Sequence, residues 1–200
     1  MSARPFTEPE FLTLMSYLGS RSRTRDAALL ALGCGTGFRI QELLSVTVGH
    51  VWHGEAVAME IALARRDLKG GKGAYRRTVR SRRVPLGEGV RKALAAHLAV
   101  IGTDDPARPL FATARSGAEG MDRSQAFRML VTACVACGID AARISTHSMR
   151  KCFARRVYEA SGHDLIRTQR ALGHSSPVTT ARYLETDSAA LDRLILDIAA

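Results

Sequence analysis

Residues 170–185 read RALGHSSPVTTARYLE and place Tyr183 nine residues after His174, on either side of a helix boundary. Gly173 follows an apolar periodic run and suits the left-handed residue that closes a helix. A serine and Pro177 come next, which is the order of an N-cap and the first position of a new helix. The stretch therefore predicts one helix that stops before Gly173 and a second, short helix with Tyr183 near its end.

The position of Tyr183 on the second helix can be read from helical spacing. Tyr183 shares a face with Thr179 and Thr180, and not with Val178 and Ala181. The tyrosine is therefore expected to point away from the apolar stripe. A single tyrosine of this kind is most often partly buried and fixed by a hydrogen bond, so the rest of the sequence has to decide its role.

The composition is that of one globular domain with a strong positive charge. The chain has 200 residues, 29 Lys and Arg against 19 Asp and Glu, and a formal net charge of +10. No segment approaches the ~20 apolar residues of a membrane span, and the N-terminal residues lack the apolar core of a signal peptide. The expected compartment is the cytoplasm, and the charge favours a polyanionic partner.

The cysteines are expected to be small buried hydrophobic residues. They are Cys34, Cys134, Cys137 and Cys152. Cys134 and Cys137 form a CxxC inside an apolar helical pattern, and a structural zinc would need a second close pair. His50 and His53 are a weak candidate for that pair. We therefore expect no disulfide framework and no metal site.

The hydrophobic pattern predicts a mainly helical α+β domain with a small three-stranded antiparallel sheet. Helices are expected within 7–20, 25–37 and 38–46, and again from 88 onward, with breaks at TDDPARP and TARSGAEG. The segment 46–69 is rich in Val, Ile and Met between turn residues, and with RRVPL at 82–86 it predicts the strands.

The segment 65–83, RRDLKGGKGAYRRTVRSRR, is the densest basic feature, with nine Lys or Arg against one Asp. It is either a solvated hairpin tip or a contact with an anion that offsets the repulsion between like charges. DNA phosphates would do so, and the glycines would let the backbone approach them. The expected DNA-binding residues are Lys72, Arg76, Arg77 and Arg80.

Two further helices are expected to carry basic residues near their starts. Arg39 follows a glycine turn, and Glu42, three residues later, is expected to cap that helix or to form an ion pair with Arg39. His147 and Arg150 are spaced to share one face of another helix. The cap of that helix is Ser145 or Thr146.

Taken together, the order and spacing of these motifs resemble the tyrosine recombinase (phage integrase) family, in its XerC/XerD-like form. The chain shows TGFRIQEL, LKGGKG, HSMR and LGHSSPVTTARY in the family's order, over roughly residues 5 to 190. The resemblance implies a single catalytic domain, residues 1–200, of the DNA breaking-rejoining type. It also implies a catalytic set, which is Arg39, Lys69, His147, Arg150, His174 and Tyr183.

The resemblance implies a reaction that these residue types can perform. The oxygen of Tyr183 attacks a DNA phosphodiester and gives a 3′-phosphotyrosyl link with a free 5′-hydroxyl. Arg39 and Arg150 fork onto the non-bridging oxygens, and His174 donates a further hydrogen bond. His147 accepts or relays the proton of the tyrosine. Arginines take the place of metal ions, so neither a metal, nor ATP, nor another cofactor is expected.

The family's hairpin lysine protonates the leaving 5′-oxygen, and here the sequence offers two candidates. Lys69 lies where the apolar strand ends, and Lys72 lies three residues further into the turn. Lys69 is favoured because a general acid must be held in position.

The resemblance also predicts partners and an assembly. Double-stranded DNA is the expected partner, with four subunits on paired recombination sites and neither a membrane nor a small-molecule substrate. An apolar helix within about 188–200, with Leu191, Leu194, Ile195 and Ile198 at helical spacing, is expected to dock on a neighbouring protomer. The family's N-terminal DNA-clamping domain is expected to be missing.

Two other functions remain open at this point. A type IB topoisomerase shares the nucleophile chemistry but relaxes supercoils alone. A DNA-binding regulator could retain the motif without using it. Nothing in the sequence identifies the DNA target or separates integration from excision or inversion.

Overall fold

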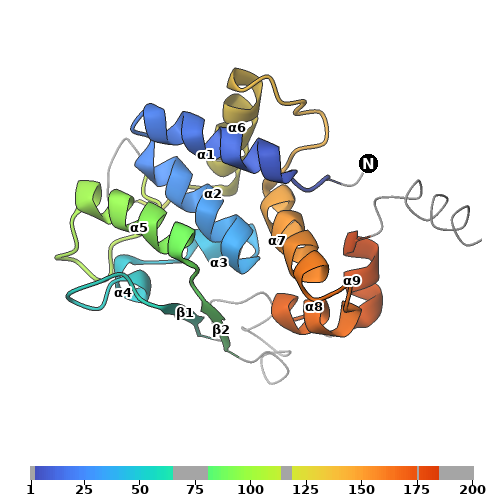
Figure 1. Ribbon diagram of the computed structural model, residues 1–200. Helices are drawn as coiled ribbons and strands as arrows, with labels where there is room; N and C mark the ends of the chain where they lie inside the picture. Colours follow the sequence, from blue (N-terminus) through green and yellow to red (C-terminus); the bar gives the residue numbers. More distant parts are fainter. Residues whose placement is uncertain (1–2, 65–80, 114–118, 175, 185–200) are drawn as a thin grey trace, which may run out of the picture. The chain divides into compact units, whose positions relative to one another are not determined.

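The computed structural model describes residues 3–64, 81–113, 119–174 and 176–184 (Figure 1). The chain divides into two compact units, 1–153 and 154–200, and the division falls within one helix. The helices are α1 (Glu8–Ser20), α2 (Thr24–Thr36), α3 (Ile40–Leu44), α4 (Val48–Val51), α5 (Glu88–Ile101), α6 (Arg123–Ala136), α7 (Thr146–Ala160), α8 (Leu165–Leu172) and α9 (Pro177–Leu184). The strands are β1 (Glu60–Leu63) and β2 (Arg82–Pro85). This mainly helical α+β fold confirms the predicted fold class.

Helix α1 begins at a capping box that the sequence predicts. The backbone N–H of Thr7 donates to Oε2 of Glu10 at 2.9 Å, and the N–H of Glu10 donates to Oγ1 of Thr7 at 3.3 Å. Each side chain thus satisfies a backbone donor that the first turn leaves without a partner. Leu14 and Leu18, one turn apart, are buried on the side of the helix that packs against α2.

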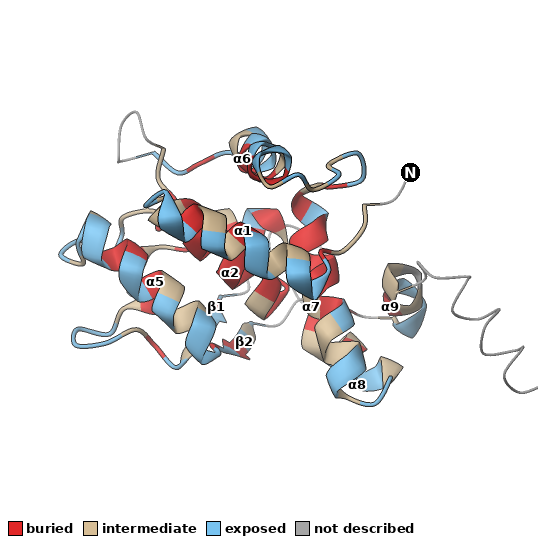
Figure 2. Ribbon diagram, turned by 45° about the horizontal axis from the view of Figure 1, so that its top comes forward, coloured by how far each residue is buried: buried red, intermediate tan, exposed pale blue. Residues whose placement is uncertain are grey.

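Helix α2 is the centre of the first unit, and its residues are almost all buried (Figure 2). The glycines of α2 were predicted to end the helix. One of them also allows close packing. Gly33 lies inside α2, and a Cβ at this position would lie 2.6 Å from Sδ of Met149, so glycine lets the start of α7 approach closely. Gly37 closes the helix in the left-handed conformation, with φ of 60°, as predicted.

The predicted strand pattern is wrong at the start of 46–69, where the chain forms the short helix α4. The backbone N–H of Thr47 donates to Nδ1 of His50 at 3.0 Å, which caps this turn. Val48 and Val51 are both buried, since a spacing of three residues places them on one face of a helical turn. A run of β-branched residues therefore satisfied the helical and the strand pattern alike, and tertiary packing decided between them.

The sheet of the described residues has two antiparallel strands, β1 and β2, instead of the predicted three. Ile61 pairs with Val84, and both are buried because they point to the helices. On the opposite face, the guanidinium of Arg83 forms an ion pair with the carboxylate of Glu60. This alternation of buried and exposed residues is typical of a sheet with one face on the core.

The second unit contains the end of α7, then α8 and α9. Asp164 caps α8 by accepting a 2.9 Å hydrogen bond from the N–H of Arg167. Gly173 closes α8 with φ of 65°, and α9 starts at Pro177. These boundaries confirm the prediction made from residues 170–185.

The predicted orientation of α9 is wrong in one respect. Val178 is 60% exposed, whereas Thr180 is completely buried, so the helix buries the face that carries the threonine. A hydroxyl group can be buried when it has a hydrogen-bond partner, and Thr180 has one. Apolarity alone therefore did not indicate which face of this short helix is inside.

Three of the four cysteines, Cys34, Cys134 and Cys152, are buried in the core, which confirms that they act as small hydrophobic residues. None of the helices within the described ranges is long and apolar enough to cross a membrane.

Candidate active site

Arg39 lies at the start of α3, directly after the turn that ends α2. Its backbone N–H donates to Oε2 of Glu42 at 2.7 Å, and its guanidinium Nη1 donates to Oε1 at 3.1 Å. Glu42 therefore serves both as helix cap and as ion-pair partner, the two roles that the sequence suggested. The carboxylate side chain is 2% exposed and the arginine side chain 37% exposed. The buried carboxylate of Glu42 thus fixes the position of Arg39, while the guanidinium stays accessible to an anion.

Arg150 is almost wholly buried, on the second turn of α7. Its Nη1 donates to the carbonyl oxygen of Gly37. A buried guanidinium requires such partners because desolvating a charge is costly. The carbonyl belongs to the C-terminus of α2, where the helix dipole also favours a cation.

A third arginine, Arg82 at the start of β2, joins these two; it belongs to the basic segment 65–83 but was not among the predicted catalytic or DNA-binding residues. Its Nη2 donates to the carbonyl oxygen of Thr36 at 2.7 Å, and its guanidinium carbon lies 4.8 Å from the ring centre of Phe38. Burial lowers the pKa of Arg82 to about 10, with a further decrease from Arg150. The available signal was an arginine at the first position of a predicted strand, but nothing local connects it to α2.

His147 lies on the first turn of α7, near the arginines. Its backbone N–H donates to Oγ of Ser145 at 3.1 Å, which confirms a serine cap. Partial burial, and then the charges of Arg123, Arg150 and Arg39, lower the pKa of the His147 imidazole. The side chain still retains contact with solvent. A lowered pKa keeps this imidazole neutral at pH 7, so that it can accept a proton.

His174 and Tyr183 are in contact within the second unit. Their rings meet edge to face, with centres 5.5 Å apart. Nδ1 of His174 lies 2.9 Å from Oγ1 of Thr180, and both residues are buried. The side-chain amide of Gln169 donates to the carbonyl oxygen of His174 at 3.0 Å. The ring and the backbone of His174 are therefore both fixed.

The predicted site residues thus form two sets in the structure. Arg39, His147 and Arg150 come together in the first unit, and His174 and Tyr183 come together in the second. The hairpin predictions lie outside the described residues; they are Lys69, Lys72, Arg76, Arg77 and Arg80. Across the described part of the chain, no three His, Cys, Asp or Glu side chains are grouped to hold a metal ion.

The arginine set can neutralise an anion. Three guanidinium groups outnumber the carboxylate of Glu42, which lies among them. A forked guanidinium matches the oxygens of a phosphate group.

Comparison with known proteins gives the family. The sequence profile of the phage integrase family matches residues 4–189. The tyrosine recombinase XerC of Ralstonia pickettii (strain 12J) is 34% identical over 172 residues, which is 82% of this chain and 50% of that protein. The chain belongs to the phage integrase family and is a tyrosine recombinase catalytic domain. It spans about half the length of that XerC relative.

Solved structures agree with this assignment. The crystal structure of XerA recombinase has a TM-score of 0.74 at 25% identity and covers 100% of this chain and 65% of its own. XerH site-specific recombinase, bound to its palindromic difH substrate, has a TM-score of 0.70 at 20% identity, covering 98% of this chain and 53% of its own. The similarity to XerH concerns the fold alone.

Proposed function

We propose that this chain is the catalytic domain of a site-specific DNA recombinase or integrase, which cuts and rejoins DNA through a 3′-phosphotyrosyl intermediate. The observation that carries the proposal is the arginine set around the Gly37 turn, since a cluster of guanidinium groups at one helix end is suited to a phosphate. The contact between His174 and Tyr183 supports it independently, and so does membership of the family.

A trapping experiment tests this function without knowledge of the target site. The protein is incubated with a pool of nicked duplex DNA of randomised sequence, in which cleavage beside the nick releases a short strand and prevents religation. A covalent protein–DNA adduct on a denaturing gel is expected, with the modified peptide containing Tyr183. Sequencing the trapped DNA then identifies the preferred site. Absence of any adduct at protein excess would contradict the proposal.

Relaxation, recombination and binding measurements on the same DNA separate the two alternative functions. A type IB topoisomerase would relax a supercoiled plasmid yet give no recombinant products between two trapped sites. A regulator with an idle site would shift DNA on a native gel without forming an adduct. Retention of every motif of the family argues against the second alternative.

The proposed chemistry follows from the charges of the site. The transition state gathers negative charge on the non-bridging oxygens of the phosphate, and Arg39 and Arg150 stabilise this charge. The mechanism needs no metal ion, because the guanidinium groups supply the positive charge. A phenol with a pKa of ~10 is a weak nucleophile at pH 7. We therefore assign His147 as the acceptor of the Tyr183 proton, a role that requires a neutral imidazole, and the lowered pKa favours that neutral form.

His174 is proposed to donate a hydrogen bond to the phosphate through Nε2, with Thr180 fixing the ring through Nδ1. Thr180→Val removes this hydroxyl at similar volume, and we expect adduct formation to slow by about fivefold, which corresponds to one hydrogen bond of roughly 1 kcal/mol. Single-turnover cleavage measures it. Thr180→Ser should remain close to the wild type, and Thr179→Val is the matched control at an exposed position. A serine variant as slow as the valine variant would rule out the hydroxyl as the cause.

The general acid is proposed to be Lys69, with Lys72 as the alternative. A positioned ammonium contributes ~10²–10⁴-fold to departure of an alkoxide. Sulfur in place of the bridging 5′-oxygen leaves without a proton. Lys69→Ala should therefore cleave normal DNA slowly and recover on the sulfur-substituted strand, while Lys72→Ala shows only a modest loss of binding. Recovery of Lys72→Ala alone would move the acid into the turn, and recovery of neither would assign the proton to another group.

Double-stranded DNA is the proposed partner, in keeping with the net charge of +10 and the basic segment 65–83. Within this segment, the proposed phosphate contacts are Lys72, Arg76, Arg77 and Arg80. Replacing Arg76, Arg77 and Arg80 together should flatten the dependence of binding on salt, because each lost contact lowers the slope by ~0.9. The cytoplasm is the proposed location.

Recombination is proposed to require four subunits on two duplexes. The segment 188–200, which lies outside the described residues, is proposed to dock on a neighbouring protomer in this assembly, since apolar residues at helical spacing favour burial. Light scattering with and without paired-site DNA measures the assembly. A tetramer in the absence of DNA, or a monomer on paired sites, would contradict it.

A further inference from the structure

Arg82 connects the sheet to the turn that presents the predicted catalytic arginines. It is the first residue of β2, where its backbone pairs with Leu63 of β1. Its guanidinium contacts the C-terminus of α2. There it donates to the carbonyl oxygens of Thr36 at 2.7 Å and of Gly37 at 3.5 Å. The same guanidinium lies over the ring of Phe38. Three consecutive residues of the turn are thus held by one side chain.

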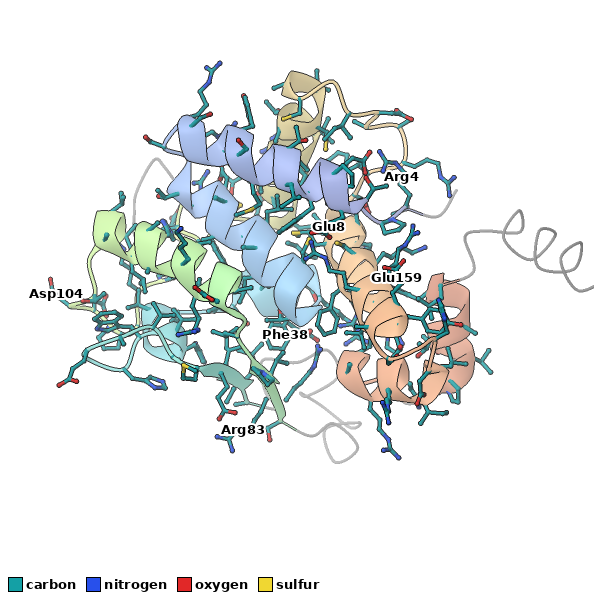
Figure 3. All side chains as sticks on the ribbon, viewed as in Figure 1. Arg4, Glu8, Phe38, Arg83, Asp104 and Glu159 are labelled. Atoms are coloured by element: carbon teal, nitrogen blue, oxygen red, sulfur yellow. The ribbon has the colours of Figure 1, made fainter. Side chains whose placement is uncertain are left out.

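The Gly37 carbonyl joins Arg82 to the reaction site. The oxygen that accepts the hydrogen bond from Arg82 also accepts one from Arg150. Arg39 follows two residues later, so the orientation of this turn sets the position of both arginines. Figure 3 shows Phe38 at the end of α2, and it shows Arg83, the neighbour of Arg82, on the side of β2 that faces away from the helices. The side chains of Arg82 and Arg83 therefore serve opposite faces of one strand.

Three guanidinium groups repel one another unless the site compensates them. The C-terminal carbonyl groups of α2 present the negative end of the helix dipole, and the carboxylate of Glu42 lies in the cluster and raises the pKa of Arg82. Arg82 is positively charged at pH 7, since its pKa of about 10 lies well above that value. The cluster is therefore built to keep all three cations in place.

We propose that Arg82 is a positioning residue for phosphate binding, which fixes the Gly37 turn so that Arg39 and Arg150 bind the non-bridging oxygens of one phosphate together. This inference rests on the proposed function. It assigns to Arg82 no contact with DNA, because its guanidinium acts on the carbonyl oxygens of the turn and not on the substrate. Misplacing a catalytic group by about 1 Å can cost 10²-fold in rate.

A substrate change distinguishes this role from a purely structural one. In a methylphosphonate, a methyl group replaces one non-bridging oxygen, and the phosphate loses its negative charge. A protein whose arginines are misplaced has less charge to stabilise on this substrate, so its defect becomes smaller. A protein that is merely less well folded is impaired equally on both substrates.

The experiment compares Arg82→Met with Arg83→Met on the phosphate and the methylphosphonate form of the site obtained by trapping. Arg83 is the matched control because it is not one of the four proposed phosphate contacts, and its side chain is 71% exposed and pairs with Glu60. For Arg82→Met we expect single-turnover cleavage about 10- to 100-fold below the wild type on the phosphate, and at least a fivefold smaller defect on the methylphosphonate. Arg83→Met should differ less than about twofold from the wild type on both.

Arg82→Lys provides a second variant in case Arg82→Met does not fold. Lysine keeps the charge but has neither the planar fork nor the stacking surface. We therefore expect a smaller defect in cleavage rate on the phosphate, which is again reduced on the methylphosphonate. An equal defect on the two substrates, or no defect in either variant, would overturn the inference while the wild-type adduct leaves the proposed function intact. Absence of the wild-type adduct would overturn both.

Discussion

Tyr183→Phe is expected to bind DNA as tightly as the wild type and to form no covalent adduct. The substitution removes only the hydroxyl oxygen that is proposed to attack phosphorus. The ring contact with His174, at 5.5 Å between centres, needs no hydroxyl, so the fold of α9 should be retained. Removing the nucleophile of an enzyme that acts by covalent catalysis typically costs at least about 10⁴-fold in rate. Adduct formation on the nicked DNA pool and binding on a native gel measure the two effects separately.

Tyr158→Phe is the matched control for this prediction. Tyr158 lies in the same unit, and its ring meets that of His163 edge to face, with centres 5.0 Å apart. The same hydroxyl deletion at this position should leave the adduct yield unchanged. An adduct that persists in Tyr183→Phe, or disappears in both variants, would mean that Tyr183 is not the nucleophile.

Arg150→Ala is expected to lower the rate of cleavage by about 10²–10³-fold, the usual effect of removing one preorganised donor to a developing negative charge. Sulfur at the bridging 5′-position should not restore the activity, because the proposed role of the guanidinium is to stabilise the non-bridging oxygens. A methylphosphonate should restore part of it. The three substrates therefore separate Arg150 from a general acid such as Lys69, for which the opposite pattern is expected.

Arg39→Ala repeats this test at a position less critical for folding. Arg150 is 2% exposed and holds the Gly37 carbonyl, so its loss also weakens the core, whereas the side chain of Arg39 is 37% exposed. Thermal unfolding of both variants measures this difference. If the defects in cleavage rate rank the three substrates in the same order for both variants, the two arginines share a role at the phosphate. Recovery of either variant by the bridging sulfur would contradict that role.

Much of the fold could be predicted from the sequence, since the signals that begin and end a helix are local. Thr7 and Glu10 lie three residues apart and satisfy each other's backbone N–H groups, so the start of α1 can be read directly. Gly37 and Gly173 close their helices in the left-handed conformation that glycine adopts easily. The prediction failed at α4, where Val48 and Val51 fit a strand and a helix equally well.

The residues of the candidate site could be predicted from the sequence, but most of the residues that contact and position them could not. The motifs identified Arg39, His147, Arg150, His174 and Tyr183 by type and order. Glu42 was found because it lies within the same helical turn as Arg39. The contact of Arg82 with the Thr36 carbonyl joins residues 46 positions apart, and no local pattern encodes such a pair. The burial of Thr180 was missed because a hydroxyl counts as polar until its partner is known.

The sequence by itself thus determined the class of the protein and the ends of most helices, and it named the candidate reacting groups, since these depend on residue types at short spacing. Only the tertiary structure decided that Gly37 offers one carbonyl to both Arg82 and Arg150, and that Thr180 faces His174. The physical reason lies in the range of the interactions. Capping and periodicity act within a turn or two of the chain. The compensation of a buried charge or hydroxyl depends on whichever groups packing brings beside it, however distant they are in sequence.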